Sequence, residues 1–278
     1  MAAKGILVFS EEPYTCVLQQ SLRGLRCDSC FEIAENLKKC TACNVLRYCN
    51  VKCQKSDWIT HKTECKCLRQ VSPSIPLDSV RLMLRIIIKK QNRGEGSSLI
   101  YSHVCIDQNH VEGSSLIYSH VCIDQNHVED VKEIENDEER REQFTKIVYT
   151  LQKLTQSIFN LPTTTELLEV FGKMVINSFT ICDGEMQSIG VGVYLGGSNL
   201  DHSCNPNAAI TFTGKTLQLR TLEPVRDLLP SELRISYIDL MSVTSDRKKQ
   251  LQQQYYFDCD CSRCSDRELY SPSNKRCL

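Results

Sequence analysis

The sequence contains no long hydrophobic run, no apolar leader and no excess of basic residues. A membrane-spanning helix needs about 20 consecutive apolar residues, and no stretch approaches that length. The only apolar stretch near the N-terminus, Ile6 to Phe9, is too short for a signal peptide and is followed by acidic residues. The formal net charge of −1 gives no indication of a nucleic-acid-binding protein. These absences predict a reducing compartment, either cytosol or nucleus, and no membrane association.

Cysteine, by contrast, is abundant and unevenly distributed. Of 17 cysteines, eight lie between Cys27 and Cys67, and three more are grouped at Cys259, Cys261 and Cys264. Disulfides do not persist in reducing compartments, so clusters of this kind indicate zinc.

The first block contains seven cysteines and one histidine with the spacing of metal ligands. Eight ligands predict two tetrahedral, structural zinc sites, and the four ligand pairs could be used in adjacent or interleaved order. Cys67 falls outside the spacing and is expected to be a free thiol. The eight ligands are Cys27, Cys30, Cys40, Cys43, Cys49, Cys53, His61 and Cys65.

The second cluster has three thiolates and therefore needs a fourth ligand from elsewhere. Cys204 stands alone in the segment NLDHSCNPN and is the obvious candidate. A four-cysteine site would join this segment to Cys259, Cys261 and Cys264, which makes three zinc ions in all.

The pattern along the chain predicts an α+β protein. Helical periodicity covers 76–91, 136–160 and 163–179, with Asp78 expected to cap the first of these helices. A strand is predicted at 5–9, a hairpin around Gly214, a further strand at 233–238 and a polar helix at 244–257.

An identical 17-residue segment occurs twice, at 95–111 and at 112–128. Two perfect copies do not indicate a solenoid, and we interpret them as a recent duplication or an assembly artefact of the gene. At most one copy can occupy the native position, so the other is expected to bulge out as a loop. The four histidines of the copies are not expected to bind metal.

The first cysteine block, with Trp58 three residues before His61, resembles a MYND zinc finger. The resemblance implies interleaved ligands, with Cys27, Cys30, Cys49 and Cys53 on one zinc ion and Cys40, Cys43, His61 and Cys65 on the other. It also implies a proline-rich peptide as the partner of the finger. Between Cys27 and Arg69 there are eight basic and five acidic residues, so direct DNA binding is expected to be weak or absent.

The segments DHSC (201–204), ISYID (235–239) and CDCSRC (259–264) resemble a SET domain with a post-SET tail. With the finger, the whole chain resembles the SET-and-MYND family of protein lysine methyltransferases, which use S-adenosylmethionine. The resemblance implies a β-rich SET domain with a helical insert, interrupted by the finger. It implies catalytic or lysine-channel roles for Tyr237, Tyr255 and Phe179. Cofactor contacts are implied for Asp201, His202, Ser198, Asn126 and Phe257.

The predicted division of the chain is a SET fragment at 1–26, the finger at 27–65, a helical insert at 66–180, the SET core at 181–258 and the zinc-binding tail at 259–278. Three departures from the family pattern lead us to expect impaired activity. The chain begins just after the position of the family's Gly-x-Gly turn, Asp201 replaces the motif asparagine, and the family's C-terminal helical-repeat domain does not follow.

The sequence supports two functions. One is a lysine methyltransferase acting on histones or other proteins in nucleus and cytoplasm, working as a monomer. The other is a non-catalytic, zinc-dependent module that binds partner peptides through the finger.

Overall fold

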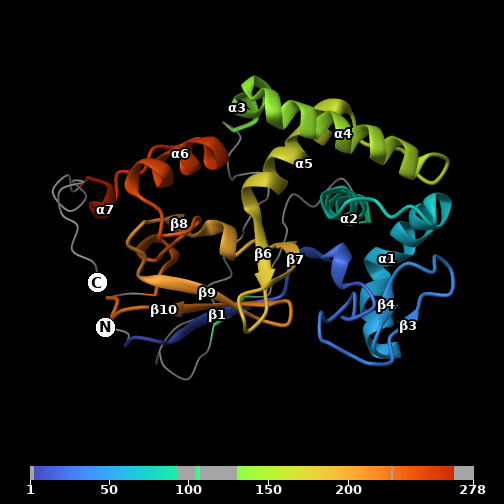
Figure 1. Ribbon diagram of the computed structural model, residues 1–278, viewed down its shortest axis with the longest axis horizontal. Helices are drawn as coiled ribbons and strands as arrows, with labels where there is room; N and C mark the ends of the chain where they lie inside the picture. Colours follow the sequence, from blue (N-terminus) through green and yellow to red (C-terminus); the bar gives the residue numbers. More distant parts are fainter. Residues whose placement is uncertain (1–2, 93–103, 107–129, 227, 266–278) are drawn as a thin grey trace.

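The computed structural model describes residues 3–92, 104–106, 130–226 and 228–265 (Figure 1). Helices and strands are mixed along the chain, which confirms the predicted α+β class. None of the described helices is both long enough and apolar enough to cross a membrane. The helices are α1 (Val51–Val71), α2 (Asp78–Asn92), α3 (Asp130–Asn136), α4 (Glu138–Thr155), α5 (Thr164–Asn177), α6 (Thr244–Tyr255) and α7 (Ser262–Ser265).

The strands form small sheets that bring together distant parts of the sequence. One has the order β5-β1-β10-β9, a second β2-β7-β6, and two-stranded pairs are formed by β11 with β8 and by β3 with β4. The strands are β1 (Leu7–Glu11), β2 (Thr15–Leu18), β3 (Lys38–Lys39), β4 (Arg47–Tyr48), β5 (Val104–Ile106), β6 (Ser178–Cys182), β7 (Ser188–Val193), β8 (Asp201–His202), β9 (Ala208–Thr213), β10 (Thr216–Thr221) and β11 (Arg234–Ile235).

The N-terminal strands belong to the same sheets as strands from the second half of the chain. β1 pairs with β10 over Leu7–Glu11, and β2 pairs with β7 over Thr15–Leu18. The zinc finger is therefore an insertion between β2 and the rest of these sheets. The predicted hairpin is β9–β10, and its turn residue Gly214 has a φ of +58°, a conformation that glycine adopts without strain.

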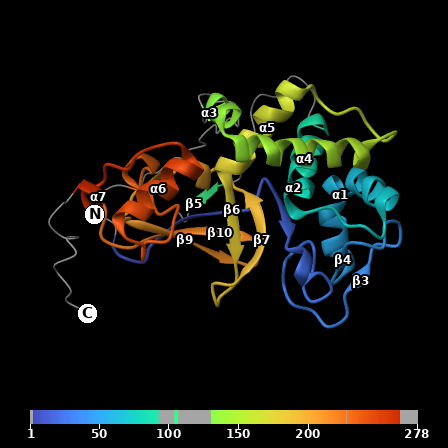
Figure 2. The same ribbon diagram turned by 45° about the horizontal axis from the view of Figure 1, so that its top comes forward.

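Helices α2, α4 and α5 pack together over one side of the sheets, with α1 alongside them (Figures 1 and 2). The helix predicted at 136–160 begins after its N-cap Asp137 and ends at Thr155. Its predicted apolar face packs into the largest hydrophobic cluster, which confirms the periodicity argument. Within α4 the residues of that face are Phe144, Ile147, Val148, Leu151 and Leu154; Ile158, also predicted on the face, lies beyond the end of the helix but packs against the same cluster.

The structure contradicts the predicted capping role of Asp78. Asp78 is the first residue of α2 rather than its cap, and its carboxylate instead accepts hydrogen bonds from the Gln20 amide and from Arg23. Apart from β5, which lies in the first copy, the 17-residue repeat falls outside the described residues. The predicted domain boundaries stay a prediction.

The finger is held against strands β2 and β7 by a close contact at Gly190 on β7. Phe31, fully buried beside the first zinc ligands, packs on this glycine. A Cβ atom at Gly190 would lie 2.6 Å from Phe31 Cε2 and 2.7 Å from the Val17 carbonyl oxygen. Arg26 adds an ion pair of 2.8 Å to Asp183, in the β6–β7 turn.

Gly190→Ala is expected to lower the free energy of unfolding by about 1–3 kcal/mol, because overpacking forces backbone and side chains apart. Urea denaturation of the zinc-loaded protein measures the change. Gly184→Ala is the matched control, since a Cβ atom there would have no atom within 4 Å. Equal stability of the two variants would contradict the close-contact assignment.

Candidate functional site: three zinc clusters and an aromatic cavity

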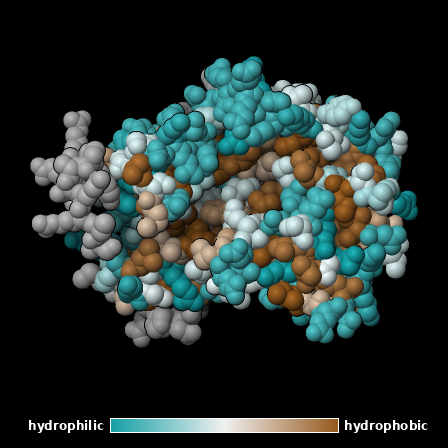
Figure 3. Space-filling model, in the orientation of Figure 1, coloured by the Kyte–Doolittle hydropathy of each residue, from teal (hydrophilic) through white to brown (hydrophobic). Residues whose placement is uncertain are grey.

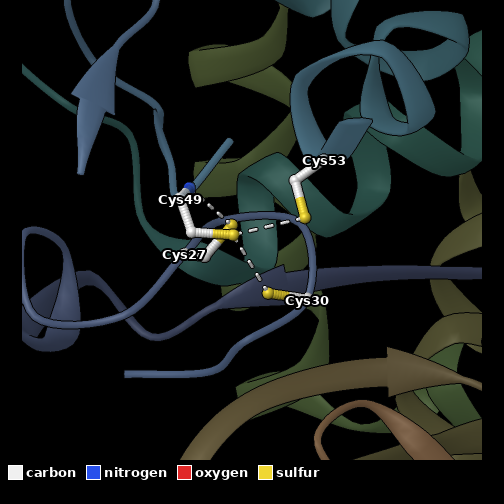
Figure 4. A group of neighbouring side chains, drawn as sticks. All are labelled: Cys27, Cys30, Cys49 and Cys53. Atoms are coloured by element: carbon white, nitrogen blue, oxygen red, sulfur yellow. Dashed lines mark hydrogen bonds between the residues drawn. The ribbon is translucent and has the colours of Figure 1, made fainter. Parts of the chain in front are cut away.

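The first cluster consists of Cys27, Cys30, Cys49 and Cys53. Their sulfur atoms all lie within 4.8 Å of one another and point to a common centre (Figure 4). The Sγ–Sγ distance is 3.8 Å from Cys30 to Cys49 and 3.4 Å from Cys49 to Cys53. Sulfurs around tetrahedral zinc are about 3.8 Å apart, so the group fits one zinc ion.

The second cluster consists of Cys40, Cys43, His61 and Cys65, all buried. The Sγ atoms of Cys40 and Cys65 are 3.7 Å apart, and Cys43 Sγ lies 3.6 Å from His61 Nε2. Burial raises the pKa of the Cys43 thiol, but hydrogen bonding to His61 and to the backbone outweighs burial and lowers it to about 6. The thiolate is the ligand form, so this group also fits zinc. Both clusters have the interleaved order.

A buried carboxylate orients the histidine of the second cluster. Glu64 Oε2 lies 3.1 Å from His61 Nδ1, and the Glu64 side chain has no solvent exposure. Carboxylate–histidine pairs of this kind fix the ring so that the other nitrogen faces the metal. Two arginines of α2 hold Glu64 in turn, with Arg81 at 2.8 Å and Arg85 at 2.7 Å.

Arg85 extends this network out of the finger. It pairs with Asp57 at 3.1 Å and donates a hydrogen bond of 3.1 Å to the Cys16 carbonyl on β2. Because Glu64 is paired with both arginines, its pKa is held well below the usual range despite its burial. The second cluster is thus joined to strand β2 through buried charges.

The third cluster joins Cys204 to the C-terminal cysteines, as the sequence predicted. Cys204, Cys259, Cys261 and Cys264 lie within the same 4.8 Å limit, and Cys264 Sγ is 3.5 Å from Cys204 Sγ. Four thiolates around one Zn²⁺ ion give the site a net charge of −2, so a cation nearby is favourable. The fully buried Arg247 supplies it, with Nη2 at 3.8 Å from Cys264 Sγ.

Next to this cluster lies a cavity of about 750 Å³. Figure 3 shows this side of the molecule hollowed beneath α5, with apolar side chains in the hollow. The cavity size is typical of small-molecule sites. It brings together every described residue for which the sequence implied a catalytic or cofactor role. These are Phe179, Ser198, Asp201, His202, Tyr237, Tyr255 and Phe257.

Aromatic rings make the wall of the cavity nearest the third cluster. The ring centroids of Tyr237 and Tyr255 are 4.9 Å apart, and those of His202 and Phe257 are 6.0 Å apart. Burial, followed by the neighbouring Asp201, raises the pKa of Tyr237 above its ordinary value. Its phenol is therefore protonated at neutral pH and donates a hydrogen bond to the Leu200 carbonyl.

His202 connects the cavity to the third zinc cluster. Burial, with a smaller effect of Arg247, lowers the pKa of His202 to about 4, so its ring is neutral at physiological pH. Its Nδ1 accepts a hydrogen bond of 3.1 Å from the Tyr237 backbone amide. The proton is therefore on Nε2, which donates a hydrogen bond of 3.2 Å to Cys204 Sγ.

Asp201, at the cavity rim, has an unforeseen partner. β8 and β11 pair in parallel with Asp201 directly opposite Arg234, and their charged groups are 3.6 Å apart. The Asp201 side chain is 72% exposed, so the pair is screened by solvent and contributes little stability. Its effect is to offset the negative charge that aspartate adds at this position.

The sequence did not indicate the groups that support the zinc ligands, namely Glu64, Arg81, Arg85 and Arg247, nor Arg234, which pairs with Asp201. The i, i+3 spacing of His61 and Glu64 was the one available signal. Asn126 lies outside the described residues.

Comparison with known proteins agrees with this geometry. Residues 27–65 match the family model described as MYND finger. The chain is 37% identical over 270 residues to the human histone-lysine N-methyltransferase SMYD3, covering 95% of this chain and 57% of that protein. It is 33% identical to the chicken N-lysine methyltransferase SMYD2 over 96% of this chain and 56% of that protein. It is also 32% identical to the Arabidopsis thaliana histone-lysine N-methyltransferase ASHR1, over 94% of this chain and 51% of that protein.

The fold and its cysteine clusters define a SET-type protein that contains a MYND zinc finger. Over the length that it shares with these relatives, the chain is similar to proteins of the SET-and-MYND family. It spans a little over half the length of the curated relatives that it matches.

Cys204→Ser is expected to reduce the zinc content from three ions to two, because a single lost thiolate opens the third site. Elemental analysis after dialysis against a weak chelator measures the content. Cys182→Ser serves as the control, since Cys182 belongs to none of the three clusters. Three ions retained in Cys204→Ser would contradict the four-cysteine site.

Glu64→Gln is expected to weaken zinc binding at the second site by about 10–100-fold, the usual effect of removing a group that orients a ligand. Chelator competition, with the other two sites as internal references, measures the affinity. Glu35→Gln, at an exposed position of the finger, controls for the loss of one charge. An unchanged second-site affinity would rule out an orienting role for Glu64.

Proposed function

We propose that the chain is an S-adenosylmethionine-dependent protein lysine N-methyltransferase that acts on histones or other proteins. The observation that carries this proposal is the convergence of the seven implied residues on one cavity. The family relatives, which are named lysine methyltransferases, support the same reaction. All four positions of each zinc cluster come from the protein, so the zinc ions act structurally and not as catalysts.

The composition of the cavity supports S-adenosylmethionine as its ligand. Aromatic rings suit the nucleoside of the cofactor, and polar groups of Asn177, Ser198 and His202 suit the amino-acid part of the cofactor. Ser198 is fixed by donating a hydrogen bond of 2.6 Å to the Tyr194 carbonyl. When bound, this molecule supplies an electrophilic methyl group.

The chain's own residues would position the lysine and favour its neutral amine, whose proton is released to water. Phe179, Tyr237 and Tyr255 are proposed to line the lysine channel, where aromatic faces attract the ammonium group as it approaches and pack against the apolar stem. Burial between these rings favours the neutral amine, because desolvation lowers the pKa of lysine. Alignment of amine and methyl group then supplies much of the rate.

Asp201 is proposed to lower activity relative to an asparagine at this position. An ionised aspartate accepts hydrogen bonds but donates none, so a carbonyl facing it loses a donor. Arg234 offsets the charge but not the lost donor.

For the finger we propose a proline-rich peptide partner, with weak or no direct DNA binding. The protein would act as a monomer in nucleus and cytoplasm. Binding of partner peptides without methyl transfer is the alternative function.

Calorimetric titration of the zinc-loaded chain with S-adenosylmethionine tests the proposal, and we expect micromolar binding. Absence of binding, with three zinc ions present, would favour the non-catalytic interaction module. Methyl transfer is then assayed with radiolabelled cofactor on histones and a protein extract.

Tyr237→Phe is expected to keep the cofactor affinity within about twofold but to lower kcat by about 100-fold, since loss of the hydrogen bond to Leu200 frees the ring and misplaces the lysine. Tyr149→Phe is the control, because Tyr149 is exposed on α4 and does not line the cavity. An unchanged kcat for Tyr237→Phe would remove Tyr237 from the catalytic assignment.

A further inference from the structure

The surface of the finger is much more basic than its composition indicates. Of five acidic residues between Cys27 and Arg69, only Glu32 and Glu35 are exposed. Asp28 and Glu64 are buried, and the Asp57 side chain is 9% exposed and paired with Arg85. Seven of the eight basic residues in the same segment are exposed. The internal acids are neutralised largely by arginines from outside the finger, so the cations dominate its surface.

Five of these cations form one stripe along α1. Their positions, together with that of Ile59, alternate in steps of three and four residues, which places them on one face of a helix. From first to last the row extends about 26 Å. We call it the cationic stripe; it consists of Lys52, Lys55, Lys62, Lys66 and Arg69. None of the five forms an ion pair with a carboxylate within the part of the chain that the structure describes.

An exposed apolar residue lies in the middle of the stripe. Ile59 is 76% exposed, and the neighbouring Trp58 is 41% exposed with its ring against His61, at a centroid distance of 6.0 Å. An apolar centre with a charged rim is the usual composition of a protein–protein contact. Tryptophan, held rigidly at such a place, is a frequent anchor.

We propose that the cationic stripe binds an acidic, amphipathic segment of a partner protein, whose carboxylates pair with the lysines and whose apolar side chain covers Ile59. Charge complementarity gives the segment its orientation and speeds its association. A phosphate backbone would satisfy the cations but would leave Ile59 uncovered. The net negative charge of the rest of the chain also disfavours long-range attraction of a nucleic acid. This proposal does not depend on methyl transfer.

The stripe lies away from the cavity. In Figures 1 and 2, α1 is at the end of the molecule opposite α6 and α7, which flank the third zinc cluster. Variants of the stripe are therefore expected to retain S-adenosylmethionine binding and three zinc ions.

The test uses the full, zinc-loaded chain and fluorescence anisotropy. The probe is a labelled 20-residue peptide with glutamates spaced three and four apart and a central leucine. A second peptide of the same composition in scrambled order and a 20-base-pair DNA duplex are the comparison probes. We expect micromolar binding of the patterned peptide, at least tenfold weaker binding of the other two, and loss of affinity as salt is raised.

Two matched pairs of variants locate the contact. Lys55→Glu with Arg69→Glu is expected to weaken peptide binding by at least about tenfold, whereas Lys38→Glu with Lys39→Glu, which makes the same change in net charge on β3, leaves it within about twofold. Ile59→Ser is expected to weaken the patterned peptide and not the duplex. The proposal is overturned if the patterned peptide does not bind, if the duplex binds more tightly, or if both charge-reversal pairs have equal effects.

Discussion

The buried Glu64 carboxylate is the interaction on which the relation between finger and SET strands depends. It contacts a zinc ligand, His61, and two arginines of α2 in a region without solvent. A buried ion pair is weak support for stability in itself, but removal of one partner leaves charges that cannot be solvated. The network therefore favours the observed packing of α1 on α2. Because Arg85 also donates to the Cys16 carbonyl, that arrangement includes strand β2. The finger is thus packed against the rest of the fold through buried contacts and is not joined to it by the chain alone.

The cavity has a comparable dependence on the third cluster. Its wall is assembled from strand ends and from the α6 C-terminus, segments separated by many residues in the sequence. The cluster places the C-terminal cysteines beside Cys204, two residues after β8. His202 hydrogen-bonds both to Cys204 and to the backbone amide of Tyr237. A neutral ring is required for both hydrogen bonds, because only the neutral imidazole has an acceptor. Burial of His202 provides that state. Zinc at this site would accordingly stabilise the position of Tyr237 as well as the tail.

The sequence predicted those features that depend on local spacing. The ligands of the finger are close in sequence, and Cys204 follows from the requirement of zinc for four ligands, so all three clusters could be anticipated. The apolar face of α4 followed from its period. The charged residues that support the zinc ligands could not be anticipated. In the sequence, Arg81 and Arg85 cannot be distinguished from exposed polar residues of a helix, because their burial is not known. For Asp78 the local pattern gave a wrong prediction. The sequence predicted a cap at the helix start, but the carboxylate makes a tertiary contact with the Gln20 amide. The roles of the cavity residues rest on resemblance, and they stay predictions.

Burial of acids and exposure of cations in the finger have one physical origin. A carboxylate inside the protein must be paired, and α2 supplies arginines that meet Glu64 and Asp57 from outside the finger. Among the described residues, no lysine of the finger is then used to pair an internal carboxylate. Lysine is costly to bury and is the cation most readily left in water, so these lysines remain on α1. A packing solution that joins finger to SET strands thereby leaves one helix face with unbalanced positive charge, and such a face favours an acidic partner over a neutral one.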